Sequence, residues 1–272
     1  MILFPRAKIN IGLHITEKRQ DGYHNLQTIF YPVNLYDALE FVVRGEKITE
    51  DELTTTGIPV DCPPEKNLVI KALSMLREYR SVPYIRIHLH KAIPNGAGLG
   101  GGSSDAATFI KGLNRYFGLG LTNDTLKEIA LSIGSDCPFF IDGVPVYAEG
   151  RGELTTPVRP IPEVYYLVLV KPELVVNTGD AYRDCLPYKH EGDLTEYYLR
   201  DIREWKNRIV NDFEKTVFIQ YPVIGKIKEE LYGSGAVYSS MSGSGSAVYG
   251  IFRNIPELPL SLRSMVIYSG RL

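Results

Sequence analysis

A glycine-rich segment at residues 94–105 constrains the fold of this 272-residue chain more than any other stretch. It reads P-N-G-A-G-L-G-G-G-S-S-D, and glycine costs roughly 0.5–1 kcal/mol relative to alanine inside a helix or strand, so a loop is expected. Just upstream, residues 84–90 alternate apolar and polar side chains and predict a strand. Downstream, apolar residues at helical spacing predict a helix, with Ser103 and Ser104 as N-cap candidates.

The order strand, glycine loop and helix N-terminus favours phosphate, because backbone N–H groups and the helix dipole both attract negative charge. Gly96, Gly98 and Gly101 satisfy the dinucleotide pattern G-x-G-x-x-G, but the acidic residue expected about 20 positions on would fall in a helix-to-helix loop. A Walker A loop is excluded because no Gly-Lys-Ser/Thr follows. A glycine turn without a ligand is the alternative. Two hydroxyls and a carboxylate at the loop's exit favour a ligand-binding loop instead.

The charge and the cysteine content indicate which partners and which cellular compartment to expect. The net charge of −2 and the pI near 6.2 indicate neither nucleic acid nor an anionic membrane as a partner. The cysteines at 62, 137 and 185 form no C-x-x-C pair, which is typical of a reducing cytosol. With no signal peptide and no run of about 18 apolar residues, a cytoplasmic location is expected.

Three motifs resemble those of the GHMP small-molecule kinases. The glycine segment resembles the second motif of that family, P-R-A-K-I-N-I-G-L at 5–13 the first, and M-S-G-S-G-S at 241–246 the third. The resemblance implies an ATP-dependent kinase with a two-lobed α/β (α+β) fold. Residues 1–155 would form an N-terminal ribosomal-protein-like lobe with a left-handed βαβ crossover, where pattern alone predicts the right-handed form. Residues 156–272 would form a ferredoxin-like C-terminal lobe.

The resemblance also implies which residues hold the cofactors. Ser103 or Ser104 would reach Mg²⁺, whose other ligands are unassigned, and Leu68 would border the adenine. The residues expected to hold the ATP phosphates are Pro94, Asn95, Gly96, Ala97, Gly98, Leu99, Gly100, Gly101, Gly102, Ser103 and Ser104.

Residues 8–15 alternate and predict a strand whose polar face carries Lys8 and Asn10. On the pattern alone this is an edge strand with its polar face in solvent. The resemblance implies instead that Lys8 and Asn10 line the acceptor site, with Lys8 stabilising charge at the transferring phosphoryl group.

Asp136 lies in the segment S-D-C-P-F-F, where Ser-Asp-x-Pro is ordinary turn chemistry. The resemblance implies that this carboxylate takes the proton of the acceptor hydroxyl, as a general base.

The segment D-G-Y-H at 21–24 predicts a hairpin. It also resembles a mark of those GHMP kinases whose substrate is a cytidine diphosphate methylerythritol. In them His24 would read the cytosine edge, Tyr23 would pack on the substrate and Tyr182 would close over the base. Two alternatives remain open. The first is another GHMP kinase, for homoserine or a mevalonate-pathway alcohol, which would not require the D-G-Y-H segment. The second is a catalytically silent nucleotide-binding protein, which would not require Lys8 and Asp136.

Weaker patterns cover the rest of the chain. Residues 44–63 are polar without a period and suggest a surface excursion, and residues 155–162 suggest a proline-rich connection between lobes. Helices are expected at 67–76, at 122–133 and within 195–232, and a buried strand at 165–170.

Overall fold

The computed structural model describes residues 1–43, 50–60 and 62–272, and its contacts divide the chain into two compact units. The first unit comprises residues 1–7, 35–95 and 100–144, and the second comprises residues 8–34, 96–99 and 145–272. The units therefore interleave along the chain. The lobe boundary expected after residue 155 stays a prediction. None of the helices in the described residues is both long and apolar enough to cross a membrane.

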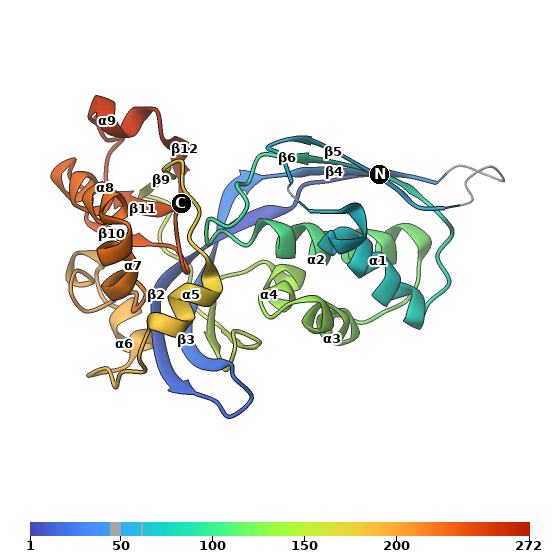
Figure 1. Cartoon of the computed structure of the whole chain (residues 1–272), viewed down its shortest axis with the longest axis horizontal. Helices are drawn as coiled ribbons and strands as arrows, with labels where there is room; N and C mark the ends of the chain where they lie inside the picture. The colour runs from blue at the N-terminus through green and yellow to red at the C-terminus, as the bar shows by residue number, and fades with distance from the viewer. Residues whose placement is uncertain (44–49, 61) are drawn as a thin grey trace. The chain divides into compact units, whose positions relative to one another are not determined.

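The first unit is a four-stranded sheet with helices packed on one face (Figure 1). The strand order is β1-β4-β6-β5, and only β5 and β6 run parallel, joined through α1. The strand predicted at 84–90 is β6, whose residues alternate between exposed and buried. The elements are β1 (Ile2–Leu3), β4 (Ala38–Val42), β5 (Glu52–Gly57), η1 (Pro64–Lys66), α1 (Leu68–Tyr79), β6 (Arg86–Lys91), α2 (Gly101–Phe117), α3 (Asn123–Ile133) and α4 (Cys137–Asp142).

The second unit contains two antiparallel four-stranded sheets, β2-β3-β7-β8 and β10-β11-β9-β12. One hydrophobic cluster joins β2, β9 and β11 to helices α7 and α8. Its elements are β2 (Arg6–Lys18), β3 (His24–Tyr36), β7 (Val146–Glu149), β8 (Leu154–Pro157), β9 (Tyr166–Val170), α5 (Thr178–Asp184), α6 (Leu194–Tyr198), η2 (Ile202–Glu204), α7 (Glu214–Gln220), α8 (Pro222–Gly233), β10 (Tyr238–Met241), β11 (Val248–Phe252), α9 (Leu260–Arg263) and β12 (Val266–Arg271). The first two residues of β2 and the last two of β3 belong to the first unit.

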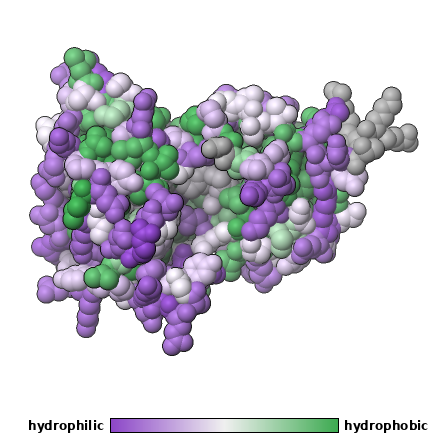
Figure 2. Space-filling model, in the orientation of Figure 1, coloured by the Kyte–Doolittle hydropathy of each residue, from purple (hydrophilic) through white to green (hydrophobic). Residues whose placement is uncertain are grey.

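The face drawn in Figure 2 is mainly polar, with separate apolar patches.

Two segments for which the sequence predicted no strand contain one. The segment 44–63, of which residues 44–49 and 61 lie outside the described residues, contains strand β5. The segment 155–162 begins with β8, which pairs with β7. Both strands are mostly exposed, so a backbone ladder forms them without the apolar alternation that would have predicted them. The turn chemistry noted at Ser135 and Asp136 is confirmed: a turn at these residues leads directly into helix α4, where Pro138 occupies the first turn.

The solvent-exposed reading of β2 is also wrong. Lys8, Asn10 and His14 on its polar face are each 3% exposed. The imidazole of His14 stacks on that of His190 with ring centroids 3.6 Å apart, and burial lowers the pKa of His14 to about 4. Sequence alternation cannot reveal this burial because the covering residues come from distant parts of the chain.

A buried ion cluster fixes the start of α2 in the first unit. The ammonium of Lys91 contacts the carboxylates of Asp37 and, at 2.7 Å, Asp105. The other oxygen of Asp37 accepts two backbone N–H bonds, from Ala92 at 2.6 Å and Ile93 at 2.8 Å. Burial raises the pKa of Asp105, and the positive charge of Lys91 opposes that rise. The cluster ties α2 to β6 just beyond the glycine loop.

Lys91→Met is expected to lower the free energy of unfolding by about 3–5 kcal/mol, because it leaves the carboxylate of Asp37 buried without a counter-ion. Urea denaturation followed by circular dichroism measures the loss. Asp105→Asn is the matched control, expected to cost under about 1.5 kcal/mol, because Oδ1 of Asp105 has no hydrogen-bond partner among the described residues. Equal losses in the two variants would contradict the role of Lys91 as the counter-ion of Asp37.

Candidate active site

The glycine loop has a backbone suited to anions. Gly96, Gly98 and Gly100 have φ angles of +60°, +76° and +70°, whereas the intervening Ala97 and Leu99 do not have positive φ. The side chains of Ala97 and Leu99 are each 1% exposed and anchor the loop. Alternation of this kind turns successive backbone N–H groups toward one side, which makes a concave anion-binding surface.

The turn between β10 and β11, which carries the M-S-G-S-G-S motif at 241–246, supports this loop. A Cβ at Gly98 would lie 1.9 Å from the carbonyl oxygen of Ser242, so only glycine permits the approach. The hydroxyl of Ser242 donates to the Gly98 carbonyl at 2.8 Å and accepts the Asn10 N–H at 3.1 Å. Asn211 holds the turn by donating to the carbonyls of Met241 and Gly243, both at 2.8 Å.

Lys8 and Asn10 lie together on β2. The Lys8 ammonium donates to Oδ1 of Asn10 at 2.5 Å and lies 4.8 Å from the centre of the Phe30 ring. The amide nitrogen of Asn10 donates to Thr28 at 3.0 Å. The backbone N–H of Lys8 donates to the Leu99 carbonyl at 3.0 Å, so the predicted acceptor residues are bonded directly to the predicted phosphate loop.

Helix α2 begins earlier than expected, which corrects the N-cap assignment. Gly100 is the N-cap residue, and Ser103 and Ser104 lie inside the first turn and a half. Ser103 is half-buried, and its hydroxyl lies near the thiol of Cys137, since both are within 4.0 Å of where a Cβ at Gly134 would be. Ser104 is fully buried, and its hydroxyl has no hydrogen-bond partner among the described residues.

The contact between Ser103 and Cys137 brings the residue that follows Asp136 to the first turn of α2. Asp136 itself is the half-buried N-cap residue of α4. Leu68 also lies near this helix end, since a Cβ at Gly102 would be 3.4 Å from it. Within the first unit, therefore, the structure brings together Ser103, the neighbourhood of Asp136 and Leu68.

The donor set fits Mg²⁺ bound together with a polyphosphate. Among the described residues, no three His, Cys, Asp or Glu side chains are grouped as metal ligands. Mg²⁺ commonly uses one or two carboxylates together with substrate phosphates and water, rather than a cage made by the protein. Ser103 and Asp136 offer such a partial set beside a helix N-terminus.

A separate aromatic pair lies elsewhere in the second unit. The rings of His24 and Tyr182 stack with centroids 5.2 Å apart and an interplanar angle of 29°. Tyr182 also meets the ring of Phe213 edge-on at 4.8 Å. Burial, and then the charge of Lys18, lower the pKa of His24, which favours the neutral imidazole. Tyr23 differs: it is 54% exposed, with the Arg151 guanidinium 4.9 Å from its ring centre.

The sequence missed Ser242, Asn211 and Thr28, which connect the loop, the turn and Asn10. The bond from Asn10 to Ser242 spans 232 positions, and the resemblance at 241–246 assigned no contact to Ser242. No local sequence pattern predicts that the Asn211 side chain holds the turn between β10 and β11.

Gly98→Ala is expected to weaken ATP binding by at least about tenfold, because the new Cβ forces the loop away from Ser242 and misplaces its N–H groups. Gly120→Ala is the matched control: it also has positive φ, at +69°, but its Cβ would meet nothing within 4 Å. Calorimetric titration with ATP compares the two variants, and thermal melts check that both are folded. Similar ATP affinities would contradict the close approach as the requirement at position 98.

Comparison with known proteins agrees with these motifs. Residues 67–144 match the family model of the GHMP kinases N terminal domain, and residues 195–258 match that of GHMP kinases C terminal. The chain is 50% identical over 269 residues to a 4-diphosphocytidyl-2-C-methyl-D-erythritol kinase of Parabacteroides distasonis, covering 99% of this chain and 96% of that protein. A protein of the same description from Bacteroides fragilis is 50% identical over 252 residues, covering 93% and 92%.

Solved structures are also similar. A crystal structure of 4-(cytidine 5'-diphospho)-2C-methyl-D-erythritol kinase has a TM-score of 0.80 at 31% identity, covering 100% of this chain and 98% of that one. The homoserine kinase of Cytophaga hutchinsonii, with a TM-score of 0.67, 18% identity and coverage of 93% and 85%, shares the fold. The chain has a mixed α/β fold and belongs to the GHMP kinase family of ATP-dependent small-molecule kinases.

Proposed function

We propose that the chain transfers the γ-phosphoryl group of ATP to the 2-hydroxyl of 4-diphosphocytidyl-2-C-methyl-D-erythritol, forming the 2-phosphate in the non-mevalonate pathway of isoprenoid biosynthesis. The similarity to kinases of that description, at 50% identity over 99% of the chain, supports the substrate. Free cysteines at positions 62, 137 and 185 support a cytoplasmic location, since thiols persist in a reducing compartment.

The observation that carries the substrate proposal is the stacked pair of His24 and Tyr182. Aromatic faces stack on a base, and a neutral imidazole both donates and accepts hydrogen bonds, as the edge of cytosine requires. Burial lowers the pKa of His24 and so favours the neutral form of the imidazole. Tyr23, beside His24 in the chain and largely exposed, is proposed to pack on the rest of the substrate.

Phosphoryl transfer asks the protein mainly for positioning and charge stabilisation. Asp136 is proposed as the base that accepts the proton of the 2-hydroxyl. Lys8 is proposed to keep that carboxylate ionised and to offset charge on the transferring group, with Asn10 fixing the acceptor. The 2.5 Å bond between Lys8 and Asn10 supports a joint role for these two residues.

Residues 94–104 are proposed to hold the ATP phosphates through loop N–H groups and the N-terminus of α2, with Leu68 bordering the adenine. Ser103 is the better placed of the two serines to contact Mg²⁺, because Ser104 is fully buried. When bound, Mg²⁺ would neutralise charge on the phosphate oxygens. The residues proposed to orient those oxygens are the loop glycines and Ser103.

The substrate proposal is tested by ADP release with Mg-ATP and three acceptors: the cytidyl substrate, homoserine and mevalonate. Turnover is expected with the cytidyl substrate alone. His24→Ala is expected to raise its KM by about tenfold or more, since a stacked and hydrogen-bonded base contact is lost. His88→Ala, at an exposed histidine of the first unit, is the control and should leave turnover unchanged. Turnover with another alcohol would exclude this substrate, and no turnover despite ATP binding would favour the silent nucleotide-binding protein.

Asp136→Asn is expected to lower kcat by about 10²–10⁴-fold while leaving ATP affinity nearly unchanged, because a general base contributes that much. Asp142→Asn, at the other end of α4, is the matched control, since Asp142 pairs with Lys127 at the surface. Steady-state kinetics and ATP titration measure both variants. A kcat for Asp136→Asn near that of wild type would remove Asp136 from the mechanism.

A further inference from the structure

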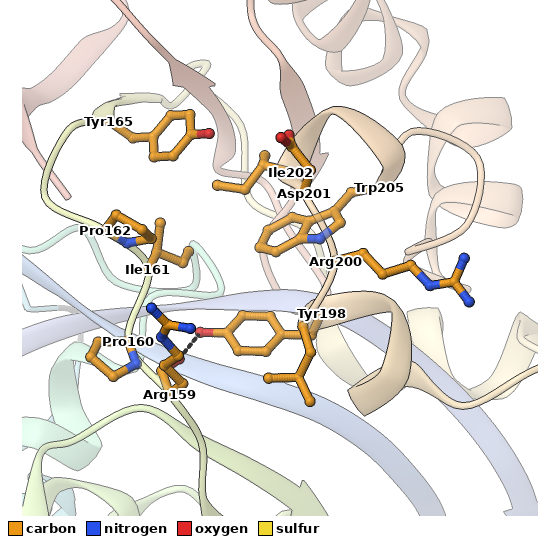
Figure 3. Close-up of a pocket in the computed structure, with 11 residues that line it drawn as sticks. Arg159, Pro160, Ile161, Pro162, Tyr165, Tyr198, Arg200, Asp201, Ile202 and Trp205 are labelled. Atoms are coloured by element: carbon orange, nitrogen blue, oxygen red, sulfur yellow. Dashed lines mark hydrogen bonds between the residues drawn. The ribbon is translucent and has the colours of Figure 1, made fainter.

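A cavity of about 260 Å³ lies in the second unit and contains none of the residues assigned to the active site (Figure 3). It is formed by the segment before β9 and by the stretch that joins α6 to η2. Its lining residues are Arg159, Pro160, Ile161, Pro162, Tyr165, Tyr198, Leu199, Arg200, Asp201, Ile202 and Trp205.

The walls of this cavity are aromatic and rigid. The rings of Tyr198 and Trp205 are stacked with centroids 5.3 Å apart and 28° between their planes, and both residues are at least 95% buried. The Tyr198 hydroxyl donates to the Arg159 carbonyl at 2.8 Å and joins the two sides of the cavity. The indole N–H of Trp205 is buried and has no hydrogen-bond partner among the described residues. Leaving such a donor unsatisfied costs free energy, and an acceptor on a ligand would relieve that cost.

The charge at the mouth is positive. Arg159 is exposed and pairs with no carboxylate in the part of the chain that the structure describes. Arg200 is also exposed, with a carboxylate oxygen of Glu204 no nearer than 3.8 Å. The lining carboxylate, Asp201, is already paired with Arg203 through bonds of 2.9 and 2.6 Å, and this pairing holds the pKa of Asp201 well below its usual range.

We propose that this cavity is a second ligand site, which binds a flat apolar molecule carrying an anionic group. The apolar body would lie against the rings of Tyr165, Tyr198 and Trp205, where aromatic surfaces stack. The anion would meet the guanidinium of Arg159, which can pair with a carboxylate or sulfonate through two parallel hydrogen bonds. A neutral apolar ligand would leave this positive charge unused, and a small inorganic anion would leave the rings uncovered.

A continuous set of buried rings connects this cavity to Asn10. Trp205 meets Tyr238 edge-on at 5.4 Å, and Tyr238 lies 6.0 Å from Tyr249. The Tyr249 hydroxyl donates to the backbone carbonyl of Asn10 at 2.9 Å. A ligand that shifts Trp205 can therefore displace the strand that carries Lys8 and Asn10 through the contacts of Tyr238 and Tyr249. The proposed site is accordingly an effector site, and this part of the inference depends on the proposed function.

Trp205 is the single tryptophan of the chain, so binding can be followed by its fluorescence. The probe is anilinonaphthalene sulfonate, a flat apolar anion that accepts excitation energy from tryptophan. Saturable transfer at one site per chain is expected, and it should persist with ATP and the cytidyl acceptor both saturating. Absence of saturable transfer, or competitive displacement by either substrate, would overturn the proposal.

The charge of Arg159 is tested with Arg159→Gln, which keeps the backbone carbonyl that holds Tyr198. The probe is expected to bind about tenfold more weakly, the effect of losing one charge-assisted pair. Arg208→Gln is the control because it removes the same charge from an exposed residue of the same unit outside the lining. Equal affinities of the two variants would overturn the anion-binding role of Arg159.

The effector role is tested by measuring the KM for the acceptor with and without the probe. Binding of the probe is expected to change this KM by about fivefold or more. Tyr249→Phe keeps the ring but removes the bond to Asn10, and is expected to bind the probe normally while losing this coupling. An unchanged KM in wild type would overturn the effector role. Failure of turnover without probe would instead count against the proposed function.

Discussion

The fold of the candidate site depends on the contact between the backbones of Gly98 and Ser242. Because no side chain separates them, the hydroxyl of Ser242 can bond both the Gly98 carbonyl and the Asn10 N–H. One buried serine thus sets the position of Gly98 in the glycine loop relative to Asn10 on β2. Asn211 fixes the turn that presents this serine. Phosphoryl transfer depends largely on how precisely the reacting groups are positioned. A close backbone contact between the loop and this turn would supply such positioning.

Two lysines, Lys91 and Lys8, are buried in the described part of the chain. Lys91 contacts two carboxylates, so its charge is matched within the fold and it anchors α2. Lys8 is equally buried, at 3% exposed, and it contacts the neutral amide of Asn10 and the ring face of Phe30. A buried cation is costly unless it is compensated. For Lys91 the two carboxylates supply that compensation, in keeping with its place at the start of α2.

The sequence predicted the parts of this site that depend on local order. Alternation identified β6 and the start of β2, and glycine density identified the loop, because period and backbone freedom are properties of neighbouring residues. It did not predict Gly100 as the N-cap of α2, since side-chain capping favours serine and the left-handed glycine here caps without a side chain. It could not predict the burial of Lys8, the hydrogen bonds of Asn211 to the turn between β10 and β11, or the buried ion cluster of Lys91. Those depend on residues brought together by the sheets, for which a single sequence gives no register.

In the second unit, His24 lies on the same pair of strands, β2 and β3, as Lys8 and Asn10, whereas its stacking partner Tyr182 lies on α5. His24 opens β3, Thr28 lies four residues further along it, and Thr28 bonds Asn10 on β2. The separation between His24 and the Lys8–Asn10 pair is therefore fixed by the pairing of β2 with β3. A substrate held at its base by His24 and Tyr182 would have its polyol at a distance that the hairpin determines. An acceptor without a cytidyl group would not be held at this fixed distance from Lys8 and Asn10. Recognition of the base would therefore orient the reacting hydroxyl as well as raise the affinity for the substrate.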